Sequence, residues 1–236
     1  MTHTSWGSIH NADESWRTKL IGDLSHVYVM PRYVELFGNY FGNLKTPSSF
    51  LELGSGNGDI AQRIRERNFP FISQYVVSEN FEEGVAWLRQ KGFKAERVDA
   101  QSIPFNDGAF DAVVCFDVMH HVEQPARMAR EMMRTGRGRL FLTESNGLSW
   151  GRKMMELTPA HRKAGERSYT PARYRSFFEQ PGFRVTRFEI QPFVFPLRLP
   201  RAFSALQVRF NRWIEKVPIL RWQCSNVYIY LEYERV

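Results

Sequence analysis

A glycine-rich turn preceded by an acidic residue is the feature of this sequence that points most clearly to ligand binding. The run Phe50–Leu53 is apolar apart from Glu52, and the turn Gly54–Gly58 follows it. Three of the five turn residues are glycines, namely Gly54, Gly56 and Gly58. Such a turn lets backbone approach a ligand and points the amides of the next helix at it. The spacing lacks the third glycine of the dinucleotide fingerprint, and Glu52 would repel a pyrophosphate but attract an ammonium or sulfonium group.

Acidic residues also follow the next two predicted strands. Glu79, with Asn80 beside it, comes directly after the apolar run Tyr75–Ser78. A carboxylate in this position can accept hydrogen bonds from both hydroxyls of a ribose. Asp99 and the backbone amide of Ala100 are able to pair with the amino group and ring nitrogen of an adenine. These residues predict a ligand that carries a nucleoside.

Groups able to transfer protons follow the fourth and fifth predicted strands. We expect His120, His121 and Glu144 to be catalytic, because open α/β sheets present reactive groups at the carboxyl ends of their strands. Each has a structural alternative. The histidines can hold the loop after the fourth strand, Glu144 can accept hydrogen bonds from loop amides, and Asp117 can orient that loop.

The elements that position these residues alternate between strand and helix. Strands are predicted at 50–53, 75–78, 95–98, 110–116, 139–143, 183–190 and 226–234, and helices at 59–67, 81–91, 125–134 and 171–178. Further helices are expected between Asn11 and Asn43, interrupted by Pro31 and closed by Gly42. This order predicts a doubly wound α/β fold with a parallel sheet covered on both faces. The alternating last strand favours an antiparallel hairpin at the sheet edge.

Together these motifs resemble the class I S-adenosylmethionine-dependent methyltransferase superfamily, and more narrowly its small-molecule, type 11-like branch. The matching segments are Glu52–Gly58, Glu79, Asp99–Phe105, Phe110–Val114, His120–Val122, Pro125–Arg139 and Glu144–Asn146. The resemblance implies a seven-stranded, mostly parallel sheet with an antiparallel C-terminal edge hairpin. It also implies one domain over 1–236, with a helical cap at 1–46, a cofactor-binding core at 47–146, and substrate-side insertions at 147–182 and 191–225.

The resemblance implies a role for each residue around S-adenosylmethionine. The three glycines would pass beneath the methionine moiety, and Glu52 would lie near its ammonium group. The remaining cofactor-binding residues would be Glu79 and Asn80 at the ribose, Asp99 and Ala100 at the adenine, and Phe116 and Asp117 beside the methionine. Phe116 departs from the family, which commonly has a small residue there, and Asp117 stands where Asn or Ser is frequent.

The implied reaction is in-line transfer of the methyl group to oxygen or nitrogen of a small-molecule metabolite, leaving S-adenosylhomocysteine. Such a displacement depends mainly on alignment and desolvation, and a base is needed only for a protonated acceptor. RNA methylation is an alternative that the net charge of +7 favours. It is opposed by Phe116–Met119 standing where an Asn-Pro-Pro-aromatic motif would be, so we expect no nucleic-acid partner. A non-catalytic cofactor-binding protein is the third interpretation.

Two basic segments bear on the acceptor. Between Arg201 and Val217 one helical face is apolar, with Phe203, Leu206, Phe210, Trp213, Ile214 and Val217, and the opposite face is basic, with Arg201, Arg209, Arg212 and Lys216. We expect the apolar face to pack on the sheet, with a lid or a membrane-surface contact as the alternative. A second group would bind an anionic acceptor and comprises Arg152, Lys153, Arg162, Lys163 and Arg167.

Composition limits the class of protein. Apolar residues make up 43% of the sequence, enough for a sizeable core, yet no run is long enough to span a membrane. The first residues lack the features of a signal peptide, so we expect a cytoplasmic protein. Only Cys115 and Cys224 are present, and their spacing suits neither zinc nor a disulfide framework, so we expect no metal site.

Overall fold

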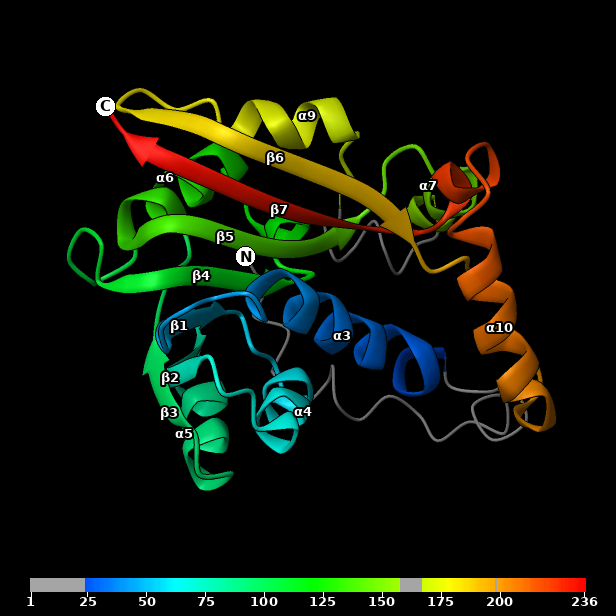
Figure 1. Ribbon diagram of the computed structural model, residues 1–236, viewed down its shortest axis with the longest axis horizontal. Coiled ribbons are helices and arrows are strands. Elements are labelled where there is room, and N and C mark those ends of the chain that lie inside the picture. The colour runs from blue at the N-terminus through cyan, green and yellow to red at the C-terminus, as the bar shows by residue number, and fades with distance from the viewer. Residues whose placement is uncertain (1–23, 158–166, 198) are drawn as a thin grey trace.

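The structure is a computed structural model that describes residues 24–157, 167–197 and 199–236, with the Met155 side chain excepted (Figure 1). In this part of the chain one sheet contains seven strands in the order β3-β2-β1-β4-β5-β7-β6. The strands are β1 (Ser48–Leu53), β2 (Ile72–Glu79), β3 (Lys94–Arg97), β4 (Phe110–Phe116), β5 (Gly136–Ser145), β6 (Phe183–Phe193) and β7 (Asn226–Arg235). The predicted doubly wound α/β fold is confirmed.

Strand direction divides the sheet into a parallel part and a hairpin. β1 pairs in parallel with β2 and β4, β2 with β3, and β4 with β5. β7 runs antiparallel to both of its neighbours, β5 and β6, which confirms the predicted C-terminal hairpin. The order of the strands reverses at β1 and β4, and ligands bind in open α/β sheets beyond the carboxyl ends of the strands at such a reversal.

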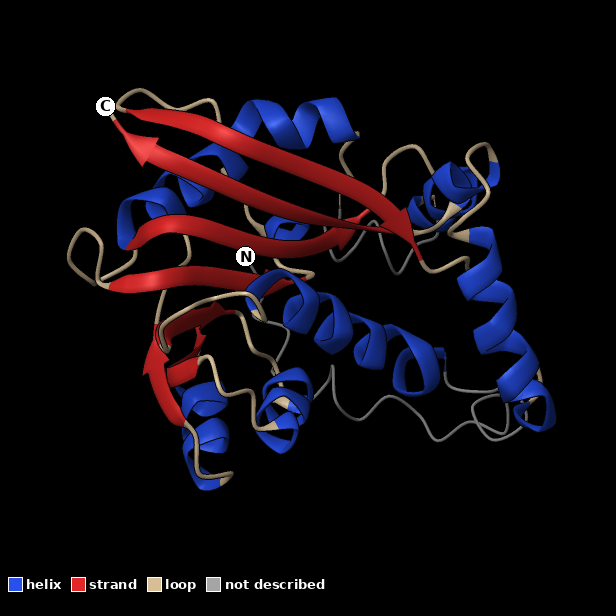
Figure 2. Cartoon of the chain, in the orientation of Figure 1, coloured by secondary structure: helices blue, strands red, loops and turns tan. Residues whose placement is uncertain are grey.

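Helices cover both faces of the sheet (Figure 2). On one face lie α3 (Met30–Phe41), α4 (Asp59–Arg67) and α5 (Glu82–Gln90), and on the other lie α6 (Pro125–Thr135) and α9 (Pro171–Phe177). Shorter helices are η1 (Ser25–Val29), η2 (Met119–His121), α7 (Trp150–Glu156), η3 (Arg201–Phe203) and η4 (Leu220–Gln223). The helix α10 (Ser204–Ile214) stands at the end of the sheet beside α7 in Figure 1.

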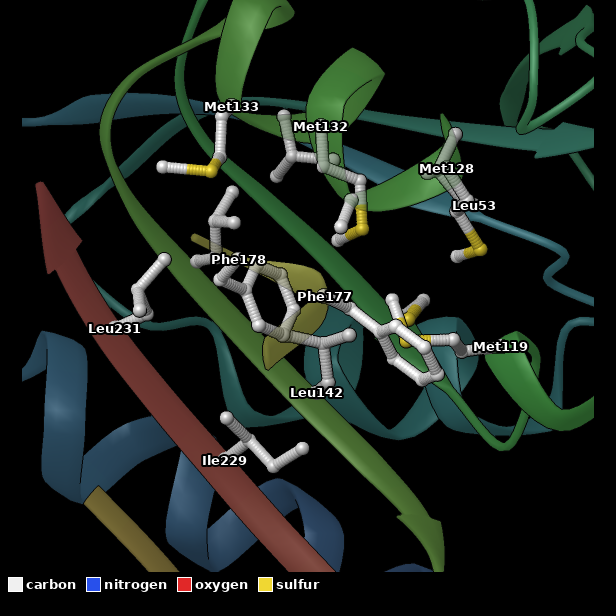
Figure 3. Packing of buried hydrophobic residues seen from close by; sticks show 14 of the residues in the cluster. Leu53, Met119, Met128, Met132, Met133, Leu142, Phe177, Phe178, Ile229 and Leu231 are labelled. Atoms are coloured by element: carbon white, nitrogen blue, oxygen red, sulfur yellow. The ribbon is translucent and has the colours of Figure 1, made fainter. Parts of the chain in front are cut away.

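A methionine-rich core fixes the strands that carry the candidate site. Met128, Met132 and Met133 of α6 are fully buried against Leu53 of β1 and Leu142 of β5 (Figure 3). Met132 and Met133 follow Met128 by four and five residues, which places all three side chains on one face of the helix. Unbranched methionine fills irregular space between a helix and a twisted sheet. This packing holds the carboxyl ends of the central strands in register.

The predicted interruption at Pro31 corresponds to a boundary between two helical segments. The π-helical segment η1 ends at Val29, and Pro31 stands in the first turn of α3, which follows it directly. Gly42 is the C-cap, as the sequence predicts. The helical segment predicted from Asn11 to residue 23 lies outside the described residues.

The prediction that the apolar face of α10 packs on the sheet is wrong. Phe203, Leu206 and Trp213 of the predicted face are exposed. Ile214 of that face is buried, together with the polar residues Gln207 and Asn211. α10 packs mainly on η1 and η3. Across the described ranges, no helix is both long and apolar enough to cross a membrane.

Candidate functional site

The predicted ligand-binding residues meet where the strand order reverses. The turn Gly54–Gly58 follows β1, Asp117 follows β4, and Glu79 ends β2. β1 lies between β2 and β4 in the sheet, so the three carboxyl ends are adjacent. The backbone amide of Gly56 donates to Oε1 of Glu79 over 2.5 Å, which joins two of these segments directly.

Each glycine of the turn has a backbone conformation that side chains disfavour. Gly54, Gly56 and Gly58 have φ values of +64°, +57° and +81°. A Cβ atom on Gly54 would lie 2.7 Å from a methyl group of Val118, and one on Gly58 would lie 2.8 Å from a methyl group of Leu88. A Cβ atom on Gly56 would meet nothing within 4 Å. Gly56 therefore borders open space, as expected of the backbone that faces a ligand, while the other two glycines pack against protein.

Because of this difference, alanine substitutions at Gly56 and Gly58 should have different effects on stability and on ligand binding. Gly58→Ala is expected to destabilise the fold by about 2–3 kcal/mol, from left-handed backbone strain plus the contact with Leu88. Gly56→Ala carries only the strain, about 1 kcal/mol, yet it places a methyl group in the open space and is expected to weaken S-adenosylhomocysteine binding at least tenfold. Urea unfolding and calorimetric titration measure the two effects. Unchanged affinity in folded Gly56→Ala would show that the ligand lies elsewhere.

The residues predicted at the ribose and adenine line the neighbouring strand ends. Glu79 accepts a second hydrogen bond from the amide of Asn80 over 3.2 Å, and Asn80 is exposed. Asp99 is also exposed and accepts from the amide of Gln101 over 2.8 Å. Ala100 is half-buried. The two carboxylates and the Ala100 amide therefore occupy the same edge of the sheet as the glycine turn.

Glu52 is buried beneath the turn. Its side chain is on the face of the sheet that α3 and α4 cover, with the residue only 1% exposed, and Oε2 accepts a hydrogen bond of 2.6 Å from the hydroxyl of Tyr75. Burial raises the pKa of Glu52 to about 7, although the hydrogen bonds of Tyr75 and Ser55 oppose the shift. A carboxyl group in this state changes its charge readily near neutral pH, and a cationic ligand nearby would favour the ionised form.

Glu52 is expected to make stability fall as pH rises. Its pKa is above the ordinary value of 4.5 in the folded protein, so the folded state binds more protons than the unfolded state between pH 4.5 and 7. Between pH 4.5 and 7 the free energy of unfolding should therefore fall by up to about 3 kcal/mol. Glu52→Gln stays neutral and keeps an acceptor for Tyr75, so it should be more stable than the parent at pH 8 and similar at pH 4. Urea unfolding of both proteins at the two pH values tests this, and a pH-independent difference would contradict it.

Glu144 organises the loop after β4. It is fully buried, and its carboxylate accepts hydrogen bonds from the amides of Val118, Met119 and His120 over 3.1, 2.7 and 3.3 Å. It also contacts Nδ1 of His120 over 2.7 Å. Burial would lower the pKa of His120, but the hydrogen bond to Glu144 and the charges of Glu144 and Asp117 raise it above its ordinary value. These contacts favour a positioning role for Glu144, and His120 is likewise buried.

His121 is the predicted catalytic residue whose side chain is exposed at this edge. It follows His120 in the short helix η2, and the two rings lie 4.0 Å apart between centroids. Because Glu144 accepts from the backbone amide of His120, it helps to fix the backbone of η2, which also carries His121.

Asp117 belongs to a polar cluster with Tyr33 and Asn226. The hydroxyl of Tyr33 donates to Oδ2 of Asp117 over 2.5 Å, and Nδ2 of Asn226 lies 3.0 Å from that hydroxyl and 3.4 Å from Oδ1. Asp117 has a φ of +58°, a strained conformation for a residue with a side chain. Burial raises its pKa to about 6, opposed by the charge of His120. Phe116, beside it, stacks on Tyr33 with 5.7 Å between ring centroids.

The predicted anion-binding group is described only in part. Lys153 pairs with Glu156 over 2.9 Å, and Arg167 is exposed. The positive charge of Arg152 acts on both Asp117 and His120. Arg162 and Lys163 lie outside the described residues. Among the described members, Arg152 therefore acts on the candidate site by its charge, and the backbone amide of Arg167 donates to the carbonyl of His120 over 3.3 Å.

Comparisons with known proteins agree with this geometry. The family model described as a methyltransferase domain matches residues 26–187. Over 110 residues the chain is 29% identical to the 27-O-demethylrifamycin SV methyltransferase of Amycolatopsis mediterranei (strain S699). That match covers 42% of this chain and 39% of the relative, so the chain spans less than half the length of the curated relative.

Solved structures share the fold at low identity. One is a S-adenosylmethionine-dependent methyltransferase from Thermotoga maritima, described as a possible histamine N-methyltransferase, with a TM-score of 0.61 and 16% identity over 89% of this chain and 92% of its own. Another is the cyclase SpnF, with a TM-score of 0.54 and 19% identity over 86% and 80% of the two chains. With the match over residues 26–187, the chain belongs to the methyltransferase domain family and has the fold of the class I S-adenosylmethionine-dependent methyltransferases.

Proposed function

We propose that this protein transfers a methyl group from S-adenosylmethionine to oxygen or nitrogen of a small-molecule acceptor and releases S-adenosylhomocysteine. The observation that carries the proposal is the open space at Gly56 beside the carboxylate of Glu79, at the point where the strand order reverses. The turn, Glu52 and the Phe116 carbonyl would hold the methionine moiety. Glu79 with Asn80 would hold the ribose, and Asp99 with Ala100 the adenine.

The cofactor supplies an already activated methyl group when it is bound, so the protein has to align the acceptor and exclude water. Phe116 and Tyr33 form a stacked apolar wall next to Asp117, which suits the exclusion of water. We propose His121 as the base for an acceptor that is protonated at neutral pH, since its side chain is exposed at this edge. His120 and Glu144 then keep the loop in place.

The acceptor would be bound by the segments that the sequence analysis assigns to it, the cap at 1–46 and the insertions at 147–182 and 191–225. In their described parts, Tyr33 approaches Asp117 by a hydrogen bond and Arg152 by charge, and Asn226, directly after the second insertion, lies 3.4 Å from Asp117. Two of the similar proteins carry names of small-molecule methyltransferases: one is named for 27-O-demethylrifamycin SV, and the other is described as a possible histamine N-methyltransferase. We propose the same broad acceptor class here.

Calorimetric titration with S-adenosylmethionine and S-adenosylhomocysteine tests the cofactor site first. We expect micromolar binding of both, equivalent to about −8 kcal/mol. Transfer of labelled methyl groups from the cofactor to a library of hydroxylated, amine and RNA acceptors then tests the reaction. Binding without transfer to any acceptor would favour a non-catalytic protein or another reaction on the same fold, as the structural similarity to a cyclase illustrates. Transfer to RNA alone would contradict the small-molecule proposal.

A further inference from the structure

Helix α10 turns apolar side chains toward solvent. Phe203, directly before the helix, is 53% exposed, and Leu206 and Trp213 within it are 56% and 54% exposed. At about 100° per residue these three side chains form one stripe along the helix. Ile219, 84% exposed, and Leu220 extend apolar surface beyond the helix. We call Phe203, Leu206, Trp213, Ile219 and Leu220 the α10 ridge.

The inward face of α10 is fixed by amide side chains. Gln207 accepts from the amide of Leu199 over 3.1 Å and donates to the carbonyl of Leu197 over 2.8 Å. Asn211 accepts from the amide of Phe195 over 2.7 Å. Rotating the helix to bury the ridge would leave these backbone groups without partners, and a buried backbone group without a partner is destabilising. The exposure of the ridge is therefore a consequence of the way in which α10 is anchored.

Basic residues flank the ridge on its exposed side. Arg201, Arg209 and Lys216 are exposed, and in the described part of the chain none of them forms an ion pair. The same rotation of about 100° per residue places Arg209 and Lys216 next to the apolar stripe, on the side away from Gln207 and Asn211. An apolar stripe with tryptophan and phenylalanine beside a cationic stripe is typical of helices that lie in the headgroup region of a membrane.

A cationic cavity is lined in part by the segment from Arg212 to Arg221. Its volume is about 340 Å³, and the cationic side chains that line it are Arg32, Arg212, Lys216 and Arg221. The Nε atoms of Arg32 and Arg221 are buried without a hydrogen-bond acceptor in the described structure. The Nη atoms of Arg32 already donate to Glu35 and Glu215, so the positive charge of the cavity comes mainly from its other cationic side chains, and clustered cations favour an anion.

The two acidic residues of this cavity are already engaged. Glu215 accepts from Tyr28 and pairs with Arg32 over 2.9 Å. Glu189 accepts from Tyr40 over 2.5 Å and pairs with Arg187. They therefore leave the charges of Lys216 and Arg221 uncompensated, and the cavity keeps a positive field.

We propose that the α10 ridge docks the protein on an anionic membrane surface, with the adjacent cavity taking a lipid headgroup phosphate. Apolar side chains enter the headgroup region, and Arg201, Arg209 and Lys216 meet its negative charge. Arg212, Lys216 and Arg221 of the cavity belong to the same segment of the chain as Trp213, Ile219 and Leu220 of the ridge. This inference concerns a surface separate from the cofactor site and does not depend on methyl transfer.

Sedimentation of the full chain with vesicles tests the docking surface. We expect the protein to partition onto vesicles of phosphatidylglycerol and phosphatidylcholine, with little binding to phosphatidylcholine alone and a decline as salt rises. The double substitution Leu206→Ser and Trp213→Ser should reduce partition about tenfold or more. Trp87→Ser, an exposed tryptophan on α5, is the matched control and should bind normally.

A variant in the cavity and a matched control test the role of the cavity in membrane binding. Arg221→Gln should lower partition onto anionic vesicles several-fold, whereas Arg130→Gln, an exposed arginine on α6, should not. Equal partition of parent and ridge variant, or equal partition onto neutral and anionic vesicles, would overturn the proposal. Concentration-dependent dimers that the ridge substitutions abolish, without vesicle binding, would assign the ridge to a second copy and overturn it as well. Titration with S-adenosylhomocysteine on the same preparations reports the cofactor site separately.

Discussion

Replacing Glu79 by alanine is expected to weaken binding of S-adenosylmethionine and S-adenosylhomocysteine by about 100-fold, or about 2.7 kcal/mol. The carboxylate holds the Gly56 amide of the turn, and in the proposed complex it also accepts the ribose hydroxyls. Hydrogen bonds to a charged group contribute about 1.5–3 kcal/mol each. Glu79→Gln keeps an acceptor oxygen without the charge, so its affinity for both ligands should lie between those of the parent and Glu79→Ala. Isothermal titration measures all three proteins.

Glu83→Ala is the matched control, because Glu83 is an exposed carboxylate on the neighbouring helix α5. It should bind the cofactor as the parent does. A thermodynamic cycle with the 2′-deoxy form of S-adenosylhomocysteine separates the two roles of Glu79. If Glu79 contacts the ribose, removing the hydroxyl costs affinity in the parent and little in Glu79→Ala. Parent-like affinity in folded Glu79→Ala would contradict the assignment.

Replacing Glu144 by alanine is expected to destabilise the protein by about 3–5 kcal/mol. The substitution leaves three backbone amides and the His120 ring without their acceptor in a site that solvent does not reach. Glu144→Gln keeps one acceptor oxygen, so its free energy of unfolding should fall by less than that of Glu144→Ala. Urea unfolding at neutral pH measures the free energies.

Glu123→Ala, an exposed acid in the loop after η2, is the control for Glu144 and should be within about 0.5 kcal/mol of the parent. The two interpretations of Glu144 predict different results. If Glu144 positions the loop, Glu144→Ala should lower both the stability and the turnover of the protein. If Glu144 is a base, Glu144→Ala should abolish turnover while its stability stays near that of the parent. The second outcome would restore the catalytic role that the sequence suggests.

The fold class follows from the amino-acid sequence, and so does the position of the glycine turn at the carboxyl end of a strand. Hydrophobic runs such as Phe110–Phe116 and the glycine turn after Phe50–Leu53 are local signals, because each element needs its own pattern of apolar and turn residues. The order of strands and helices then leaves few topologies. Pro171 and Thr170 likewise begin α9 where the sequence predicts, with the Thr170 hydroxyl accepting from the amide of Arg173.

The tertiary structure alone decided what each polar group contacts. Tyr33 and Asn226 reach Asp117 from 84 and 109 residues away, which depends on how α3 and β7 pack and on no local pattern. Glu144 lies at the carboxyl end of β5, as a catalytic residue would, yet its neighbours are amides that only the folded loop brings together. α10 has a well-formed apolar stripe, but the backbone groups of residues 195–199 required Gln207 and Asn211 on its inner side. Hydrophobic periodicity predicts which residues share a face, and the partners available in the fold decide which face is buried.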